Sequence, residues 1–80
     1  MLQRISVWID SKFGEEIANS IKVDNINIPT GMRIEVRGNK EGVEVVAEVE
    51  YRDPKSILTL RNTVDEILEH IEMLIKVLGE

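Results

Sequence analysis

The feature that most constrains the fold is a run of apolar residues at helical spacing in the last third of the chain. Steps of three and four separate these residues, which aligns their side chains on one face of an α-helix. Asp53 is suited to capping the first turn, Pro54 to the first helical position and Gly79 to ending the helix. We therefore expect a helix from Pro54 to Gly79 with an apolar face of Ile57, Leu60, Val64, Ile67, Leu68, Ile71, Leu74, Ile75 and Leu78.

The expected length of this helix indicates an interaction function. A helix of about 25 residues is about 37 Å long, whereas strands of about 7 residues reach only about 23 Å. We therefore expect the helix to extend past the sheet that it covers, with apolar side chains on the extension. A neighbouring chain would cover that end, which predicts a protein-interaction module.

Three segments alternate apolar and polar residues, as half-buried strands do: Gln3–Ile9, Met32–Arg37 and Val43–Tyr51. Gly38 to Gly42 is predicted to form a hairpin turn, because it is rich in residues that accept positive φ. The expected inward residues of the third strand are Val43, Val45, Ala47, Val49 and Tyr51. On the opposite face, Arg33 and Arg37 are expected to pair across the hairpin with Glu44, Glu48 and Glu50.

The remaining segments complete an order of β-α-β-β-α. Ser11 can cap a short helix from about Lys12 to Ile21. Val23 to Gly31 is predicted to form a loop. We expect Ile26 and Ile28 of this loop to contact the core. We expect one domain over residues 1–80 with a KH-like α+β fold. In this fold the first strand pairs with the third, and both helices cover one face of a three-stranded antiparallel sheet.

Composition narrows the classes of function. The 80 residues include no cysteine and one histidine, so neither a disulfide, a thiolate metal site nor a histidine-rich metal site is expected. The net charge of −5 argues against strong autonomous nucleic-acid binding. No apolar run approaches 18 residues, which predicts a soluble, cytoplasmic protein. No catalytic motif is present, and we expect a non-enzyme without a cofactor or metal.

Two side chains each admit two interpretations. Trp8 lies on the polar face of its strand and is either packed against a loop or a contact residue at an interface. Arg61 lies four residues before Asp65 on the long helix. It is either one half of a surface salt bridge or a charged contact to a partner.

The chain resembles a known family in the segments Ile17–Ile21, Val23–Asn25 and Pro29 and in its C-terminal pattern S-x-L-x-L-R-N-T-V-x-x-x-L-x-x-I. A short β-α-β-β-α chain with this ending looks like the small dimerisation subunit of the archaeal and eukaryotic KEOPS complex. The resemblance spans nearly the whole chain. It implies the same fold as that expected above.

The resemblance also implies a non-catalytic scaffold. In that complex the small subunit dimerises and docks through its helices onto the threonylcarbamoyl transferase subunit, which modifies the adenosine beside the anticodon of tRNAs. The partners implied are this transferase, a second copy or a paralogous small subunit, and tRNA only through the assembled complex, with no membrane. The implied interface residues are Phe13, Ile17, Ile21, Leu60, Arg61, Val64, Leu68, Ile71 and Ile75.

Two departures from the family keep other interpretations open. Asp65 and Glu66 stand where family members usually have Asn and Ser, and the segment Asp53–Arg61 is a few residues longer. These differences also fit a paralogous fifth subunit that pairs with the standard small subunit and blocks complex dimerisation. A free-standing KH-like RNA-binding module and a small homodimer outside any complex are further alternatives, although the chain lacks the G-x-x-G loop of KH domains.

Overall fold

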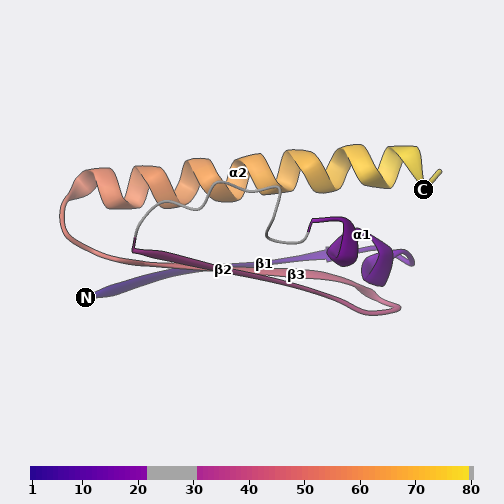
Figure 1. Ribbon diagram of the computed structural model, residues 1–80, viewed down its shortest axis with the longest axis horizontal. Helices are drawn as coiled ribbons and strands as arrows, with labels where there is room; N and C mark the ends of the chain where they lie inside the picture. Colours follow the sequence, from indigo (N-terminus) through magenta and orange to yellow (C-terminus); the bar gives the residue numbers. More distant parts are fainter. Residues whose placement is uncertain (22–30, 80) are drawn as a thin grey trace.

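The computed structural model describes residues 1–21 and 31–79 (Figure 1). Its elements run in the predicted order β-α-β-β-α, and β3 lies between β1 and β2 in one antiparallel sheet. The predicted α+β fold and the pairing of the first strand with the third are confirmed. The contacts predicted for Ile26 and Ile28 lie outside the described residues. The element bounds are β1 Leu2–Asp10, α1 Gly14–Ser20, β2 Met32–Gly38, β3 Gly42–Glu50 and α2 Pro54–Val77.

The central strand β3 alternates between two environments. Its odd-numbered residues face the helices and are buried, and each lies opposite an apolar or half-buried residue of β1 and β2. The prediction that Tyr51 continues this inward series is wrong, because β3 ends at Glu50 and the Tyr51 side chain is exposed. The helix-facing residues of β3 are Val43, Val45, Ala47 and Val49.

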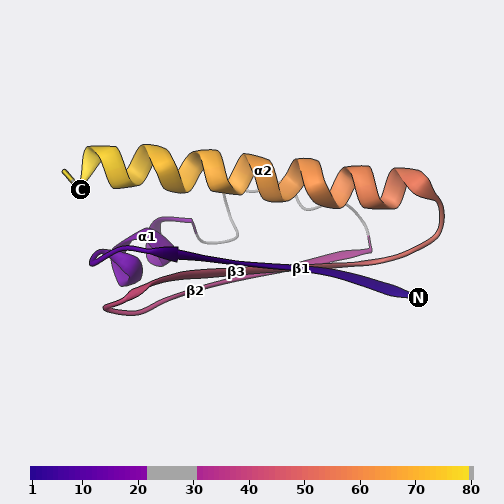
Figure 2. The same cartoon turned by 180° about the vertical axis from the view of Figure 1, so that it is seen from behind.

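The long helix α2 runs along the full length of the sheet (Figures 1 and 2). The Asp53 carboxylate accepts hydrogen bonds from the backbone N–H groups of Lys55 at 2.8 Å and Ser56 at 3.3 Å, which confirms the predicted N-cap. At the other end Gly79 has a positive φ of 83° and its N–H donates to the carbonyl of Lys76, as a helix stop does.

The predicted extension of α2 past the sheet is mostly wrong. β1 and β3 are nine residues each, about 30 Å at the rise of an antiparallel strand. The 24 residues of α2 cover about 36 Å. Both strands are therefore about two residues longer than the 7 residues assumed above, and the excess of helix over sheet is only about one turn.

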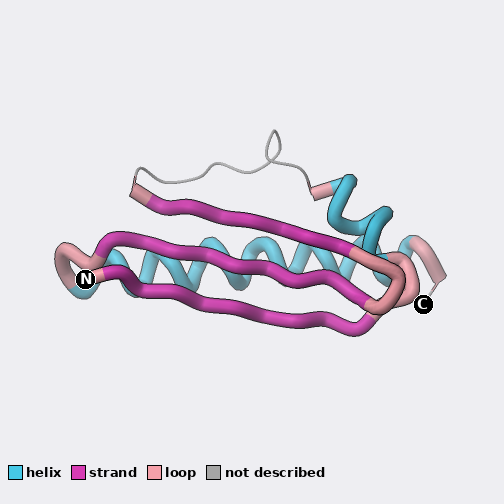
Figure 3. The backbone as a smooth tube through the Cα atoms, turned by 90° about the horizontal axis from the view of Figure 1, so that it is seen from below, coloured by secondary structure: helices cyan, strands magenta, loops and turns pink. Residues whose placement is uncertain are grey.

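The short helix α1 packs beside the turn that joins β2 to β3 (Figure 3). It is shorter than predicted: Phe13 is the N-cap, and Ser11 instead accepts a hydrogen bond from the Phe13 N–H at 3.1 Å. The predicted hairpin turn is confirmed, although none of its residues has a positive φ. The side-chain oxygen of Asn39 holds it, by accepting from the N–H groups of Glu41 at 2.7 Å and Gly42 at 3.0 Å.

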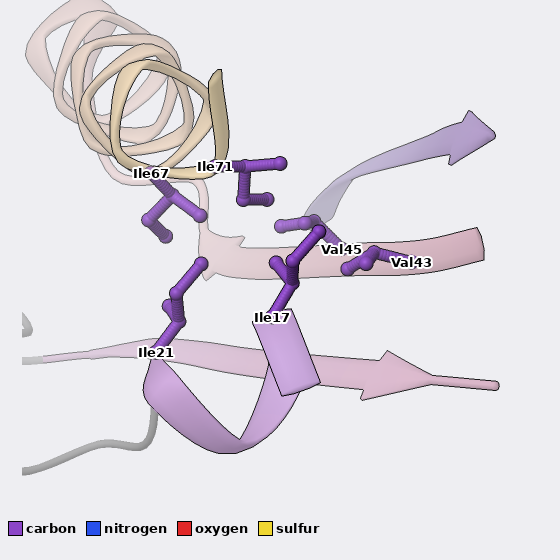
Figure 4. Packing of buried hydrophobic residues seen from close by; sticks show 6 residues of the cluster. All are labelled: Ile17, Ile21, Val43, Val45, Ile67 and Ile71. Atoms are coloured by element: carbon purple, nitrogen blue, oxygen red, sulfur yellow. The ribbon is translucent and has the colours of Figure 1, made fainter. Parts of the chain in front are cut away.

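Two apolar clusters join the helices to the sheet. One gathers side chains from α1, α2 and β3 (Figure 4) and the other joins the first half of α2 to the far end of β3. Both clusters lie on the same face of the sheet, and burial of this apolar surface is the main force that holds α2 in place. The first cluster comprises Ile17, Ile21, Val43, Val45, Ile67 and Ile71, and the second Ala47, Val49, Leu60 and Val64. Within residues 1–21 and 31–79, no helix has the length and apolarity required to cross a membrane.

Candidate interaction surface

The nine interface residues predicted from the resemblance fall into three groups. Phe13, Leu68 and Ile75 are half-buried, and the Arg61 side chain is exposed. The other five are buried within this chain, so their side chains offer almost no surface to a partner in this conformation. Those five are Ile17, Ile21, Leu60, Val64 and Ile71.

The most exposed apolar residues of α2 lie off the predicted face. Leu58 is 57% exposed, Met73 62% and Val77 79%. Sequence reasoning missed them as surface residues because it concentrated on the stripe at three- and four-residue spacing. The available signal was that these apolar residues interrupt the otherwise charged side of the helix.

A half-buried apolar surface lies where α2 meets β1. Residues four apart on a helix differ by about 40° around its axis. In Figure 4, Ile67 lies on the side of Ile21, and Ile71, four residues later, lies on the side of Val45. The same rotation continues from Ile71 to Ile75 and from Val64 to Leu68, which places Leu68 and Ile75 on the flank of α2 turned away from α1. We call this surface the β1 flank; it comprises Ile5, Val7, Ile9, Leu68 and Ile75, all half-buried.

The face of the sheet opposite the helices is covered with charged residues. Arg4 pairs with Glu48 across β1 and β3, with a distance of 3.5 Å from Nε to Oε1. The predicted ion pairs across the hairpin are wrong: Arg37 pairs with Glu35 on its own strand, and Arg33 forms no ion pair within the described ranges. Both arginines are exposed, although Glu48 is half-buried, so each pair contributes little to stability.

Trp8 lies on this same outer face and is 47% exposed. Its indole N–H donates to Asp10 Oδ1 at 2.8 Å. The ring covers Gly42, where an added Cβ would be 2.6 Å from Trp8 Cζ2. Trp8 is therefore held against its own sheet, while about half of its surface stays open to solvent.

Arg61 is the exposed charged residue of the predicted set. The interpretation as a salt bridge with Asp65 is wrong, since the part of the chain that the structure describes gives Arg61 no ion pair within 4.0 Å. Its guanidinium lies on the solvent side of α2, one turn after Ile57 and Leu58. The alternative interpretation of Arg61, as a contact to a partner, stays a prediction.

We next consider metal sites and clefts on the described part of the chain. Residues 1–21 and 31–79 contain no group of three His, Cys, Asp or Glu side chains that could hold a metal ion. A cleft of about 410 Å³ lies between α1 and β2, lined by residues that include Glu15 and Arg37. A second cleft, of about 250 Å³, lies on the solvent side of α2 beside His70.

The Met1 ammonium donates to Glu50 at 2.9 Å and lowers the pKa of that carboxyl, which stays solvent-exposed.

Comparison of the chain with protein-family models, curated proteins and solved structures found no match.

Proposed function

We propose that this chain is a non-catalytic scaffold and dimerisation subunit of KEOPS type, which supports threonylcarbamoylation of the adenosine beside the anticodon in tRNA. In this role it binds the transferase subunit and a second small subunit, and it meets tRNA only through the assembled complex. It acts in the cytoplasm and uses no cofactor.

The observation that carries this proposal is the fold. A three-stranded antiparallel sheet with two helices in the order β-α-β-β-α is the architecture that the resemblance implies. The resemblance rests on residues of α2, among them Leu60 and Arg61. Leu60 packs into the core and fixes the orientation of this part of the helix, so the neighbouring Arg61 is held at the surface.

The surface supports a binding role in a second way. Apolar side chains remain exposed on α2, and a surface of this kind gains free energy when a partner covers it. Arg61 is also positively charged, and its guanidinium forms no ion pair within residues 1–21 and 31–79. An acidic group on a partner would form a charge-assisted contact with it.

Co-expression of this chain with the catalytic transferase subunit of KEOPS tests the proposal. We expect the two proteins to co-purify and to elute together in size-exclusion chromatography. The charge reversal Arg61→Glu should weaken binding by about tenfold or more, the effect of losing a contact worth about 1.4 kcal/mol. Lys40→Glu is the matched control, because it reverses an exposed basic residue in the hairpin turn, far from α2 in sequence.

The control variant should bind as the unchanged chain does. Failure of the unchanged chain to co-purify with the transferase would overturn the proposal. Equal binding by the Arg61→Glu variant and the unchanged chain would remove Arg61 from the interface and leave the apolar residues of α2 as its basis.

A further inference from the structure

Trp8 of β1 lies on the outer face of the sheet, which is turned away from α2 (Figure 3). Its ring lies over Gly42 of β3, where an added Cβ would be 2.6 Å from Cζ2 and 3.0 Å from Cε2. This contact holds the indole in a fixed position on the central strand. Because about half of the Trp8 surface stays exposed, the part of the ring away from Gly42 is open to a ligand.

Two carboxylates lie beside this ring. Asp10 Oδ1 accepts the hydrogen bond of the indole N–H at 2.8 Å, which holds one carboxylate at the nitrogen edge of the ring. Glu44 of β3 lies directly opposite Trp8 in the register and is half-buried. All three side chains belong to the outer face, because successive residues of a strand alternate between the two faces of a sheet.

The pairing geometry brings Glu44 close to the indole. The Ser11 N–H donates to the Glu41 carbonyl at 3.0 Å, so these two residues form a hydrogen-bonded pair. The two kinds of pair alternate along an antiparallel ladder, which makes Trp8 and Glu44 a non-hydrogen-bonded pair. Cβ atoms of opposite residues are about 4.5–5.5 Å apart and are closest in pairs of this kind.

Neither carboxylate is neutralised by a cation in the described part of the chain. Arg37 of β2 lies opposite Glu44 on its other side, but the Arg37 guanidinium pairs with Glu35. Glu44 and Asp10 themselves form no ion pair within 4.0 Å among the described residues. Two negative charges therefore remain at the rim of the Trp8 ring.

The ring itself is also free of a cation from the described residues. The cation that stacks on an aromatic ring there is Lys12, with its ammonium 5.3 Å from the centre of the Phe13 ring. Trp8 has no such neighbour within residues 1–21 and 31–79.

An indole with two carboxylates beside it attracts a positive group. The face of tryptophan is the strongest aromatic partner for a cation, and carboxylates form charge-assisted hydrogen bonds with N–H donors. A guanidinium fits this arrangement better than an ammonium. It is planar, stacks on an aromatic ring and directs several N–H groups outward in one plane, whereas the lysine ammonium is a compact point charge.

We propose that Trp8, Asp10 and Glu44 form a binding site for an arginine side chain in an exposed segment of a partner protein. The guanidinium stacks on the open part of the indole and donates to Glu44 and to the Asp10 oxygen that the indole does not use. A basic partner also suits the net charge of −5 of this chain. The site lies on the face opposite α2, so it goes beyond the proposed docking of α2 onto the transferase.

An NMR titration with the peptide acetyl-Gly-Arg-Gly-amide at low ionic strength tests the site. Trp8 is the sole tryptophan, so the chain gives a single indole N–H resonance. We expect this resonance to shift saturably at millimolar peptide, since exposed charged groups contribute little each. The same peptide with citrulline in place of arginine keeps the shape without the charge and should cause almost no shift. The peptide with lysine should bind more weakly than the arginine peptide.

Conservative variants separate the site from general charge attraction. Glu44→Gln and Asp10→Asn each remove one charge, and Asp10→Asn keeps an oxygen that can accept the indole N–H. Each should weaken binding of the arginine peptide by about threefold or more. Glu48→Gln is the matched control, because it removes the same charge on the same strand and face, about 13 Å from Glu44. This control should bind as the unchanged chain does.

Three results would each overturn the proposal: no saturable shift with the arginine peptide, equal binding of the citrulline peptide, or equal affinity of the Glu44→Gln and Glu48→Gln variants. Equal binding of the lysine peptide would overturn the assignment to arginine. If a second copy of the chain covered Trp8, the indole resonance would shift on concentration of the chain alone and the peptide would have no effect, which would also overturn the proposal. Should Asp10→Asn fail to fold, the peptides and Glu44→Gln still decide the question.

Discussion

Gly38 of β2 and Gly14 of α1 are in contact through their backbones. A Cβ added at Gly38 would overlap the carbonyl oxygen of Gly14 and would lie 2.8 Å from the Cβ of Ala18. Neither glycine has a positive φ. Both are therefore needed for the space that they leave, which lets α1 lie directly on the hairpin end of the sheet.

Gly38→Ala should destabilise the protein by about 1–3 kcal/mol, the usual cost of forcing an extra methyl group into a packed contact. Urea unfolding monitored by circular dichroism measures this change. Lys40→Ala, two residues away and exposed, should change the free energy of unfolding by less than about 0.5 kcal/mol. Equal effects of the two substitutions would contradict the close contact between α1 and β2.

Asp53→Ala should destabilise the protein by about 1 kcal/mol, because it leaves the N–H groups of Lys55 and Ser56 without their side-chain acceptor. The same unfolding measurement applies. Lys55→Ala keeps the backbone N–H that the cap uses and serves as control. A loss of stability in the control equal to that in Asp53→Ala would show that the cap is not the cause.

The elements of this fold could be predicted because their signals are local. The spacing of apolar residues in α2, the cap at Asp53 and the alternation in β3 each follow from a few neighbouring side chains. The length of β1 was underestimated, since Leu2 and Asp10 join the sheet through backbone pairing with β3. That error produced the predicted extension of α2 past the sheet.

The surface was harder to predict than the fold. Spacing identifies the apolar face of α2, but it does not decide whether the sheet or a partner covers that face. The structure shows that the sheet and α1 cover Leu60, Val64 and Ile71. The ion pair of Arg37 with Glu35 was also missed, because the register places Glu44 directly opposite Arg37 while long side chains reach other neighbours.

Ile71→Ala should destabilise the protein by about 2–5 kcal/mol, the range for removal of a large aliphatic side chain from a packed core. Met73→Ala, two residues later on the exposed side of α2, should change stability by less than about 0.5 kcal/mol. Thermal unfolding of both variants checks the contrast. A mild effect of Ile71→Ala in a well-folded variant would mean that Ile71 faces a partner and not this sheet.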